Sequence, residues 1–264
     1  MNLPAGFDNT IALEAAALVN QAYAQFGKFT EGASWTLDGN YDTLGLLSAR
    51  PEGLLARVEP FGFVARNRAS GNVFVTFRGT QSLDDWMSDF TFPQVAHPWG
   101  RAEQGFSLIY DQCSQKVRAA VAGAPLSPNV FVTGHSLGAG LAVLATADLV
   151  NSGVAPGAGM YSFAGPRVGD LAFAAQFNLR VPVRWRIVNT EDIVTTVPLA
   201  TPGLFSDEHP HSPLGIMLML SRNLNFEHVG NAVSFTVHNG SIAANHAMAT
   251  YIGALNAAAA AAAA

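Results

Sequence analysis

Cysteine is almost missing from this sequence. Cys113 is the single cysteine among 264 residues, so an intramolecular disulfide is excluded. The stretch around it, FSLIYDQCSQKV, has the spacing of an amphipathic helix and contains no glycine turn that would expose a thiol. We therefore interpret Cys113 as a buried structural residue and not as a nucleophile.

Charge and long apolar runs are also scarce. Only 12% of the residues are charged, the formal net charge is −5, and lysine and arginine form no cluster. Binding to nucleic acid or electrostatic docking on an anionic membrane needs a basic patch, so its absence argues against both partners. No apolar run reaches the roughly 18 residues of a membrane-spanning helix, which predicts no transmembrane segment.

The two ends of the sequence bear on location and domain organisation. The opening MNLPAGFDNT lacks the basic region and apolar core of a secretory signal peptide. The protein is then either intracellular or the mature form of a secreted protein, and we favour secretion over a cytoplasmic location. No repeat or linker divides the chain, so one domain is predicted over residues 1–256. The eight alanines at 257–264 are interpreted as a remnant outside the native fold.

Strand and helix patterns alternate along the second half of the chain. Strand patterns occupy 130–134, 160–164, 183–189 and 229–237, and helices are expected at 101–122, after Ser136, near 170–177 and at 245–255. A helix at 10–26 and an antiparallel hairpin of 62–67 with 73–78 precede them. The alternation predicts an α/β fold with a mostly parallel central sheet, helices on both faces and an antiparallel hairpin near its start.

One short motif stands where a strand pattern becomes a helix pattern. Gly134, Ser136 and Gly138 form G-x-S-x-G between VFVT and LGAGLAVLATADLV. In a nucleophile elbow the serine occupies a strained turn, and the crowded backbone leaves no room for side chains at the flanking glycines. The alternative is an ordinary glycine turn. The flanking patterns favour Ser136 as a nucleophile, provided that a base and an acid follow.

A serine hydroxyl becomes a nucleophile when an imidazole takes its proton, and that imidazole needs an orienting carboxylate. Glu191 and Asp192 follow the strand pattern at 183–189, at the carboxyl end where open α/β sheets place their sites. Asp192 is followed directly by Ile193 and Val194, which favours a partly buried position. We predict Asp192 as the acid, and a solvated turn acid is the alternative.

The sequence offers several candidates for the base, which are His209, His211, His228, His238 and His246. His209 and His211 resemble a metal pair in a proline-broken loop, but two histidines with loose carboxylates do not define a tetrahedral site, so no metal is predicted. His228 and His238 lie in or at the ends of a strand pattern, where structural histidines are common. His246 opens the last predicted helix, a position that suits a base, and spacing alone leaves it balanced against the other four.

The chain resembles the class 3 lipase family, the fungal-lipase-like α/β hydrolases, from Val64 to Leu255. The resemblance is carried by ordered motifs: FRGT at 77–80, QGF at 104–106, GHSLG at 134–138, SFAGPRVG at 162–169, NTEDIVTTVP at 189–198, HVG at 228–230 and HAMATYI at 246–252. It implies an α/β-hydrolase fold. Fungal members usually carry disulfides and this chain can form none, so we expect a bacterial-type member.

The resemblance also assigns roles. It implies Ser136 as the nucleophile, Asp192 as the acid and His246 as the base, with His228 in the place of the family's structural histidine. The oxyanion donors would be the backbone N–H of Leu137 and Thr80, the latter through its N–H and hydroxyl. This chemistry requires no metal or organic cofactor.

The segment SLDDWMSDF follows the predicted oxyanion threonine. Its apolar side chains Leu83, Trp86, Met87 and Phe90 have the spacing of one helix face. In the family the segment at this place is the lid, so we predict a lid-like segment at 82–100 with these four residues as acyl-binding candidates. A helix fixed as a wall of the site is the alternative.

Together these observations imply a serine carboxylester hydrolase that cleaves acylglycerol esters, as a triacylglycerol lipase does. A feruloyl or short-chain esterase of the same family is the nearest alternative. A catalytically silent binding protein on the hydrolase fold is another class, which the intact set of residues disfavours. The expected partner is an ester or lipid substrate, met at a lipid–water interface.

Overall fold

The computed structural model describes residues 1, 3–51, 57–80, 93–125, 129–198 and 225–263. Within these ranges one large sheet has the strand order β1-β2-β3-β6-β7-β8-β9, and a separate two-stranded ribbon pairs β4 with β5. The strands of the large sheet are β1 Tyr41–Ala49, β2 Glu59–Asn67, β3 Val73–Phe77, β6 Val130–His135, β7 Gly159–Phe163, β8 Arg184–Asn189 and β9 Asn231–Phe235. The ribbon consists of β4 Gln94–His97 and β5 Gly100–Glu103.

The large sheet changes from antiparallel to parallel at β3. β1 pairs with β2 and β2 with β3 in antiparallel register, whereas β3, β6, β7, β8 and β9 pair in parallel. The parallel strands all end at the same edge, so the residues after β3, β6 and β8 meet there. The predicted α/β fold with a mostly parallel sheet is confirmed.

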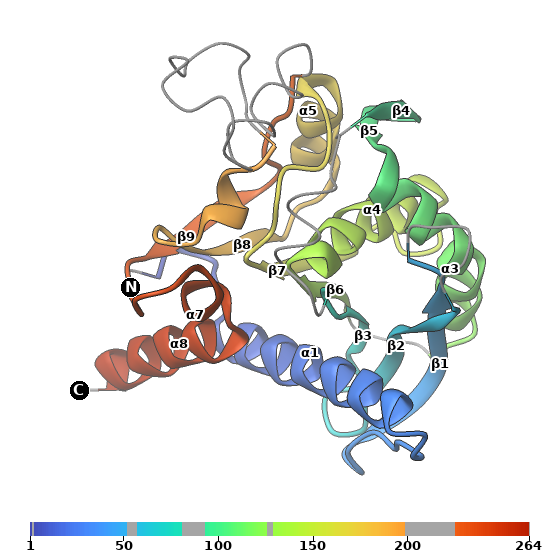
Figure 1. The fold of residues 1–264 in the computed structure, drawn as a ribbon. Coiled ribbons are helices and arrows are strands. Elements are labelled where there is room, and N and C mark those ends of the chain that lie inside the picture. Colours follow the sequence, from blue (N-terminus) through green and yellow to red (C-terminus); the bar gives the residue numbers. More distant parts are fainter. Residues whose placement is uncertain (2, 52–56, 81–92, 126–128, 199–224, 264) are drawn as a thin grey trace.

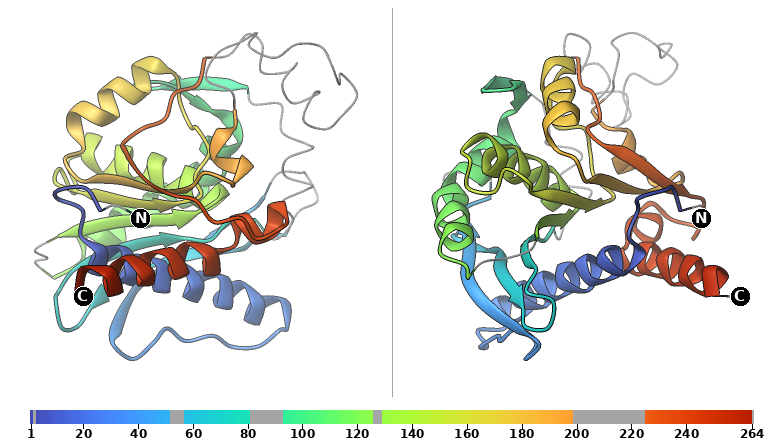
Figure 2. Two further views of the ribbon diagram at one scale, coloured as in Figure 1. Left: turned by 90° about the vertical axis from the view of Figure 1, so that its left-hand side faces the viewer. Right: turned by 180° about the vertical axis from the view of Figure 1, so that it is seen from behind.

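Helices cover both faces of the sheet. α1 Asn9–Thr30 and α8 Met248–Ala263 lie side by side on one face (Figure 1). The opposite face carries α3 Gln104–Ala122, α4 Leu137–Asn151 and α5 Leu171–Arg180, as the rear view in Figure 2 also shows. The described residues also form two short helices, η1 Ile193–Thr196 and α7 Ile242–His246.

Two buried cores result from the alternation of side chains along the strands. Phe74 and Phe131 point toward α1 and α8, while the next residues, Val75 and Val132, point toward α3 and α4. All four are buried. Because both faces are covered, the central strands are apolar at nearly every position, which explains the continuous apolar runs in the sequence.

Several helix boundaries differ from the sequence prediction, and the helix expected at 10–26 extends to Thr30. The helix expected at 101–122 begins at Gln104, because Glu103 is its N-cap and accepts hydrogen bonds from the backbone N–H groups of Gly105 and Phe106. Arg101 therefore belongs to β5, which was not predicted. The helix expected at 245–255 is broken at Ala247, whose ψ of 138° is extended, so His246 ends α7 and does not open the last helix. The alanine segment extends α8 to Ala263.

Candidate active site

Ser136 lies between β6 and α4 in a strained backbone conformation. Its φ is 59° and its ψ is −128°, a combination that non-glycine residues rarely adopt. The two glycines are required by close packing. A Cβ on Gly134 would lie 2.1 Å from the carbonyl oxygen of Gly138, and a Cβ on Gly138 would lie 2.4 Å from the carbonyl oxygen of Arg78. The sharp turn therefore depends on glycine at both positions, as a nucleophile elbow does.

Asp192 and His246 lie together at the same edge of the sheet. Asp192 follows β8 and caps η1, where its Oδ1 accepts from the backbone N–H of Val194 at 3.0 Å. Its Oδ2 is 2.8 Å from His246 Nδ1 and also accepts the hydroxyl of Tyr251 at 2.6 Å. The exposed fraction is 1% for Asp192 and 6% for His246. A buried carboxylate so placed holds the proton of the imidazole on Nδ1 and leaves Nε2 as the acceptor.

Within the described part of the chain, the two atoms that a proton transfer would join form no hydrogen bond, either with each other or with another group. Ser136 Oγ and His246 Nε2 are both buried, and neither makes a hydrogen bond to any described residue. Buried polar atoms without partners are uncommon and need an explanation. The serine hydroxyl and the imidazole nitrogen are the groups that would meet in an active complex, so their lack of structural partners fits a chemical role.

The other candidate histidines are placed elsewhere. His228 Nε2 donates to the carbonyl oxygen of Thr195 at 2.8 Å, and burial together with Arg186 and Arg167 lowers the pKa of its ring to about 3. The side chain of His238 is 70% exposed and lies 3.0 Å from Glu191. His209 and His211, with the metal alternative that they raised, lie outside the described residues. Among the histidines the structure describes, His246 is the one in contact with Asp192.

The predicted oxyanion residues flank Ser136 on two sides. Leu137 is the first residue of α4, so its backbone N–H is one of the free donors of a helix N-terminus. Thr80 follows β3, and the residue before it packs against the elbow, because a Cβ on Gly79 would lie 2.8 Å from Ser136 Cβ. The structure thus brings the end of β3 against the serine. The lid and acyl-binding candidates Leu83, Trp86, Met87 and Phe90 lie outside the described residues.

Several residues at the site were not predicted from the sequence. Tyr251 binds Asp192, while Tyr23 and His135 join a second chain of hydrogen bonds beside His246. His135 could have been noticed, because it directly precedes Ser136 in the motif. Tyr23 gives no local signal, since a tyrosine on the apolar face of a helix resembles an ordinary core residue.

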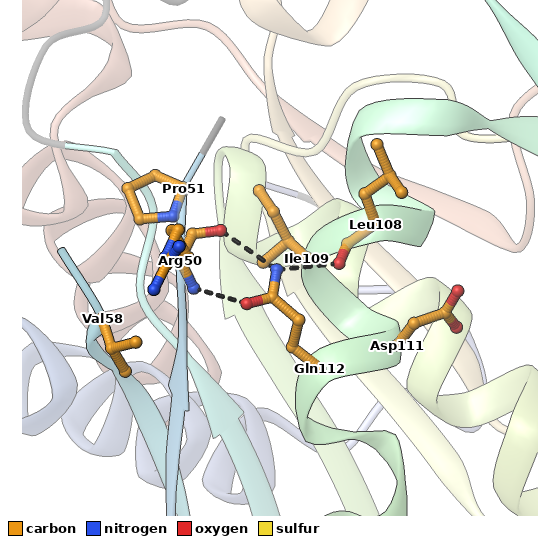
Figure 3. A pocket seen from close by; sticks show the side chains of 7 residues that line it. All are labelled: Arg50, Pro51, Val58, Leu108, Ile109, Asp111 and Gln112. Atoms are coloured by element: carbon orange, nitrogen blue, oxygen red, sulfur yellow. Dashed lines mark hydrogen bonds between the residues drawn. The ribbon is translucent and has the colours of Figure 1, made fainter. Parts of the chain in front are cut away.

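A depression lies between the end of β1, the start of β2 and the helix α3 (Figure 3). Arg50 and Gln112 span it with backbone-to-side-chain hydrogen bonds of 2.8 and 3.1 Å. Val58 and Leu108, each 53% exposed, form its apolar part. Neither Ser136, Asp192 nor His246 lines this depression.

The fold and the site together define an α/β-hydrolase with a serine elbow and a buried histidine–aspartate pair. Residues 74–201 match the family described as lipase (class 3). Secreted mono- and diacylglycerol lipase A of Penicillium cyclopium is 34% identical over 150 residues, which cover 54% of this chain and 48% of that protein. The chain belongs to the class 3 lipase family.

A plant relative agrees with this membership, and a solved structure agrees with the fold. Phospholipase A1-Ialpha2 of Arabidopsis thaliana, a chloroplastic protein, is 30% identical over 223 residues, covering 70% of this chain and 44% of the relative. The solved structure of Rhizomucor miehei triacylglyceride lipase superposes with a TM-score of 0.65 at 24% identity, covering 88% of this chain and 82% of that one. The chain spans about half the length of the curated relatives it matches.

The expectation of a bacterial-type member is not borne out. The relatives named above come from fungi and a plant, and the absence of disulfides did not identify a bacterial branch. Cys113 is buried, and burial raises the pKa of its thiol to about 12. Among the described residues, no helix is long and apolar enough to cross a membrane.

Proposed function

We propose that this protein hydrolyses the ester bonds of acylglycerols, with Ser136 as the nucleophile. The observation that carries the proposal is the contact between His246 and Asp192, 2.8 Å long and buried, at the sheet edge where the elbow presents Ser136. Membership of the class 3 lipase family supports it, as does the relative named as a mono- and diacylglycerol lipase.

The proposed reaction has two halves. His246 Nε2 takes the proton of Ser136 as the serine oxygen attacks the ester carbonyl, and the N–H groups of Leu137 and Thr80 receive the negative charge of the tetrahedral oxygen. The same imidazole then protonates the departing alcohol, leaving an acyl-enzyme. Water repeats the sequence and releases the fatty acid. Asp192 stabilises the imidazolium without taking its proton, and each missing oxyanion donor costs about 3 to 4 kcal/mol of transition-state stabilisation.

A fluorescent alkyl phosphonate tests the proposed nucleophile. The reagent should label the wild-type protein at Ser136, as mass spectrometry of the peptides would show, and should leave Ser136→Ala unlabelled. Hydrolysis of dibutyrin or a soluble p-nitrophenyl ester should disappear in the same variant while its melting temperature stays close to that of wild type. Ser152, which lies at the end of α4, provides a control, because Ser152→Ala should keep both labelling and turnover.

Rates measured on a panel of esters test which substrate class the protein prefers. We propose long-chain acylglycerols at a lipid–water interface, because such esters are nearly insoluble and the fungal relative is named for acylglycerol cleavage. Rates on emulsified mono-, di- and triacylglycerols should then exceed those on feruloyl esters and on dissolved short-chain esters. The plant relative is named a phospholipase A1, so a phosphatidylcholine arm belongs in the panel. Dominant activity on phosphatidylcholine or feruloyl esters would replace the acylglycerol assignment.

We also propose that the protein acts outside the cell. The Penicillium cyclopium relative is named a secreted lipase, whereas the Arabidopsis thaliana relative is chloroplastic. Ester hydrolysis and immunodetection in the culture medium and in washed cells of the source organism would decide between the two locations. Protein confined to the cells would reject secretion.

A further inference from the structure

His135 is a buried histidine that the proposed mechanism leaves without a task. It ends β6 directly before Ser136, and its exposed fraction is 4%. Both ring nitrogens are engaged. Nε2 lies 2.7 Å from the backbone carbonyl oxygen of His246, and Nδ1 lies 2.7 Å from the hydroxyl oxygen of Tyr23 on α1. The ring of His135 therefore links α1 to the segment that carries His246, the proposed base.

The direction of these hydrogen bonds is fixed by chemistry. A carbonyl oxygen only accepts, so Nε2 of His135 must carry the proton that it donates to His246. Burial, and next the proximity of His246, lower the pKa of His135 well below its usual value, so the ring stays neutral and Nδ1 is an acceptor. Tyr23 must then donate to Nδ1. Burial raises the pKa of Tyr23 to about 12, which keeps its hydroxyl proton in place.

The oxygen of Tyr23 accepts one more hydrogen bond, from the end of β3. The backbone N–H of Gly79 donates to it at 3.0 Å. On the other side, the buried guanidinium of Arg78 donates to the carbonyl oxygen of Gly79 at 2.7 Å. That carbonyl and the N–H of Thr80 belong to the same planar trans peptide group and point in opposite directions. Fixing the carbonyl of Gly79 therefore fixes the direction of the Thr80 N–H.

We propose that Tyr23 and His135 are positioning residues. They hold the Gly79–Thr80 peptide group, which carries the proposed oxyanion donor, and the backbone at His246 in fixed positions relative to Ser136. The proposal rests on the proposed function, since it concerns the same site. Its basis is an unbroken chain in which Gly79 N–H donates to Tyr23, Tyr23 to His135, and His135 to the carbonyl of His246. None of its hydrogen bonds involves Ser136 Oγ or His246 Nε2. The serine, its base and its oxyanion donor thus share one rigid frame.

Steady-state kinetics of Tyr23→Phe on a soluble ester test the proposal. The substitution keeps the ring but removes the acceptor of Gly79 and the donor to His135. We expect kcat to fall about tenfold with KM unchanged, since the loss concerns the transition state. The affinity for an alkyl boronic acid, which forms a tetrahedral adduct on the serine, should weaken by a similar factor. Tyr41→Phe is the matched control, because that phenol also bonds α1, through Glu14, away from the site.

Substitution of His135 separates positioning from packing. His135→Gln retains an N–H donor for the carbonyl of His246, whereas His135→Leu retains none, so Gln should keep more of the wild-type kcat than Leu. The double variant Tyr23→Phe/His135→Leu should be little worse than His135→Leu alone, because the two residues act through one chain. A wild-type kcat in Tyr23→Phe, with a loss of melting temperature no different from that of Tyr41→Phe, would overturn the proposal.

A measurement on the wild-type protein guards against variants that fail to fold. Nitrogen-15 NMR of the histidine rings should find His135 as the neutral tautomer protonated on Nε2, with no titration between pH 5 and 8. Protonation on Nδ1, or titration in that range, would overturn the proposed chain. The result does not depend on ester hydrolysis. If wild-type protein has this tautomer but cleaves no ester, the proposed function fails while the hydrogen-bond chain stands.

Discussion

Asp192 Oδ2 accepts two hydrogen bonds at once, from Nδ1 of His246 at 2.8 Å and from the hydroxyl of Tyr251 at 2.6 Å. Both donors come from the last stretch of the chain, and all three side chains are buried. Burial, followed by the adjacent carboxylate, raises the pKa of Tyr251, so its phenol remains a donor. The carboxylate is thereby held in one orientation, which in turn sets the orientation of the imidazole.

Asp192→Asn should reduce kcat by about ten-thousand-fold while leaving the fold intact, because an amide in this place favours the wrong imidazole tautomer. The neighbouring Glu191 is the control. Its carboxylate bonds His238 at the surface, so Glu191→Gln should retain nearly full activity. The prediction is checked by kcat on a soluble ester and by circular dichroism of both variants. Equal losses in the two variants would show that Asp192 has been given the wrong role.

Thr80→Val should lower kcat by roughly tenfold to a thousandfold with little change in KM, because it removes a hydroxyl that stabilises the transition state and keeps the backbone donor. Thr76, on β3 just before Thr80, offers a matched control. Its hydroxyl is buried and lacks a hydrogen-bond partner among the described residues, so Thr76→Val should be neutral for both kinetics and stability. A normal kcat in Thr80→Val would restrict the contribution of this residue to its N–H group.

Gly134→Ala should destabilise the protein by about 1 to 3 kcal/mol or more, because the added methyl group meets backbone atoms that cannot move aside. Its Cβ would lie 2.1 Å from the carbonyl oxygen of Gly138, whereas a Cβ on Gly157 would have no neighbour within 4 Å. Urea denaturation of Gly134→Ala and Gly157→Ala provides the comparison. Similar midpoints for the two variants would contradict the packing explanation of the elbow.

The free energy of unfolding should fall as the pH drops from 6.5 toward about 3. Burial and two arginines lower the pKa of His228 to about 3 in the folded protein, while an unfolded histidine titrates near 6.5. Between these values the unfolded chain binds a proton that the folded protein does not, so stability is full above 6.5 and decreases below it. The lowered pKa of His135 acts in the same direction.

Urea titrations at several pH values check this dependence. Between pH 7 and 4 the free energy of unfolding of His228→Gln should decrease less than that of wild type. The variant lacks the histidine whose pKa is lowered in the folded protein. Parallel pH profiles for wild type and His228→Gln would assign the acid sensitivity to other groups.

The parts of the site that were predictable are those whose signal is local. The elbow at Ser136 is predicted by a motif of five adjacent residues, and Asp192 closely follows a strong strand pattern. The choice of His246 among five histidines depended on the family resemblance, because a base is brought to its serine by the fold and not by spacing. Whether these residues carry out catalysis stays a prediction until the variants are measured.

The parts that could not be predicted depend on distant partners or on weak patterns. β1 lies at the sheet edge with most of its residues only partly buried, so YDTLGLLSA lacks a clean alternation. β4 and β5 are four residues each, too short for a periodic signal. Tyr23 and His135 are 112 residues apart in the chain, and nothing near either residue indicates the other.

Because α1 and α8 lie side by side, this part of the fold can form only after both helices have been synthesised. Asn9 Nδ2 donates to the carbonyl oxygen of Leu255 at 3.2 Å, across a separation of 246 residues. A ribosome synthesises α1 well before α8, so Ser136 is part of the nascent chain for more than a hundred residues of translation before Tyr251 on α8 is added. Closing so long a loop is slow and comes late in folding. The proposed ester hydrolysis should therefore begin only after α8 has docked beside α1.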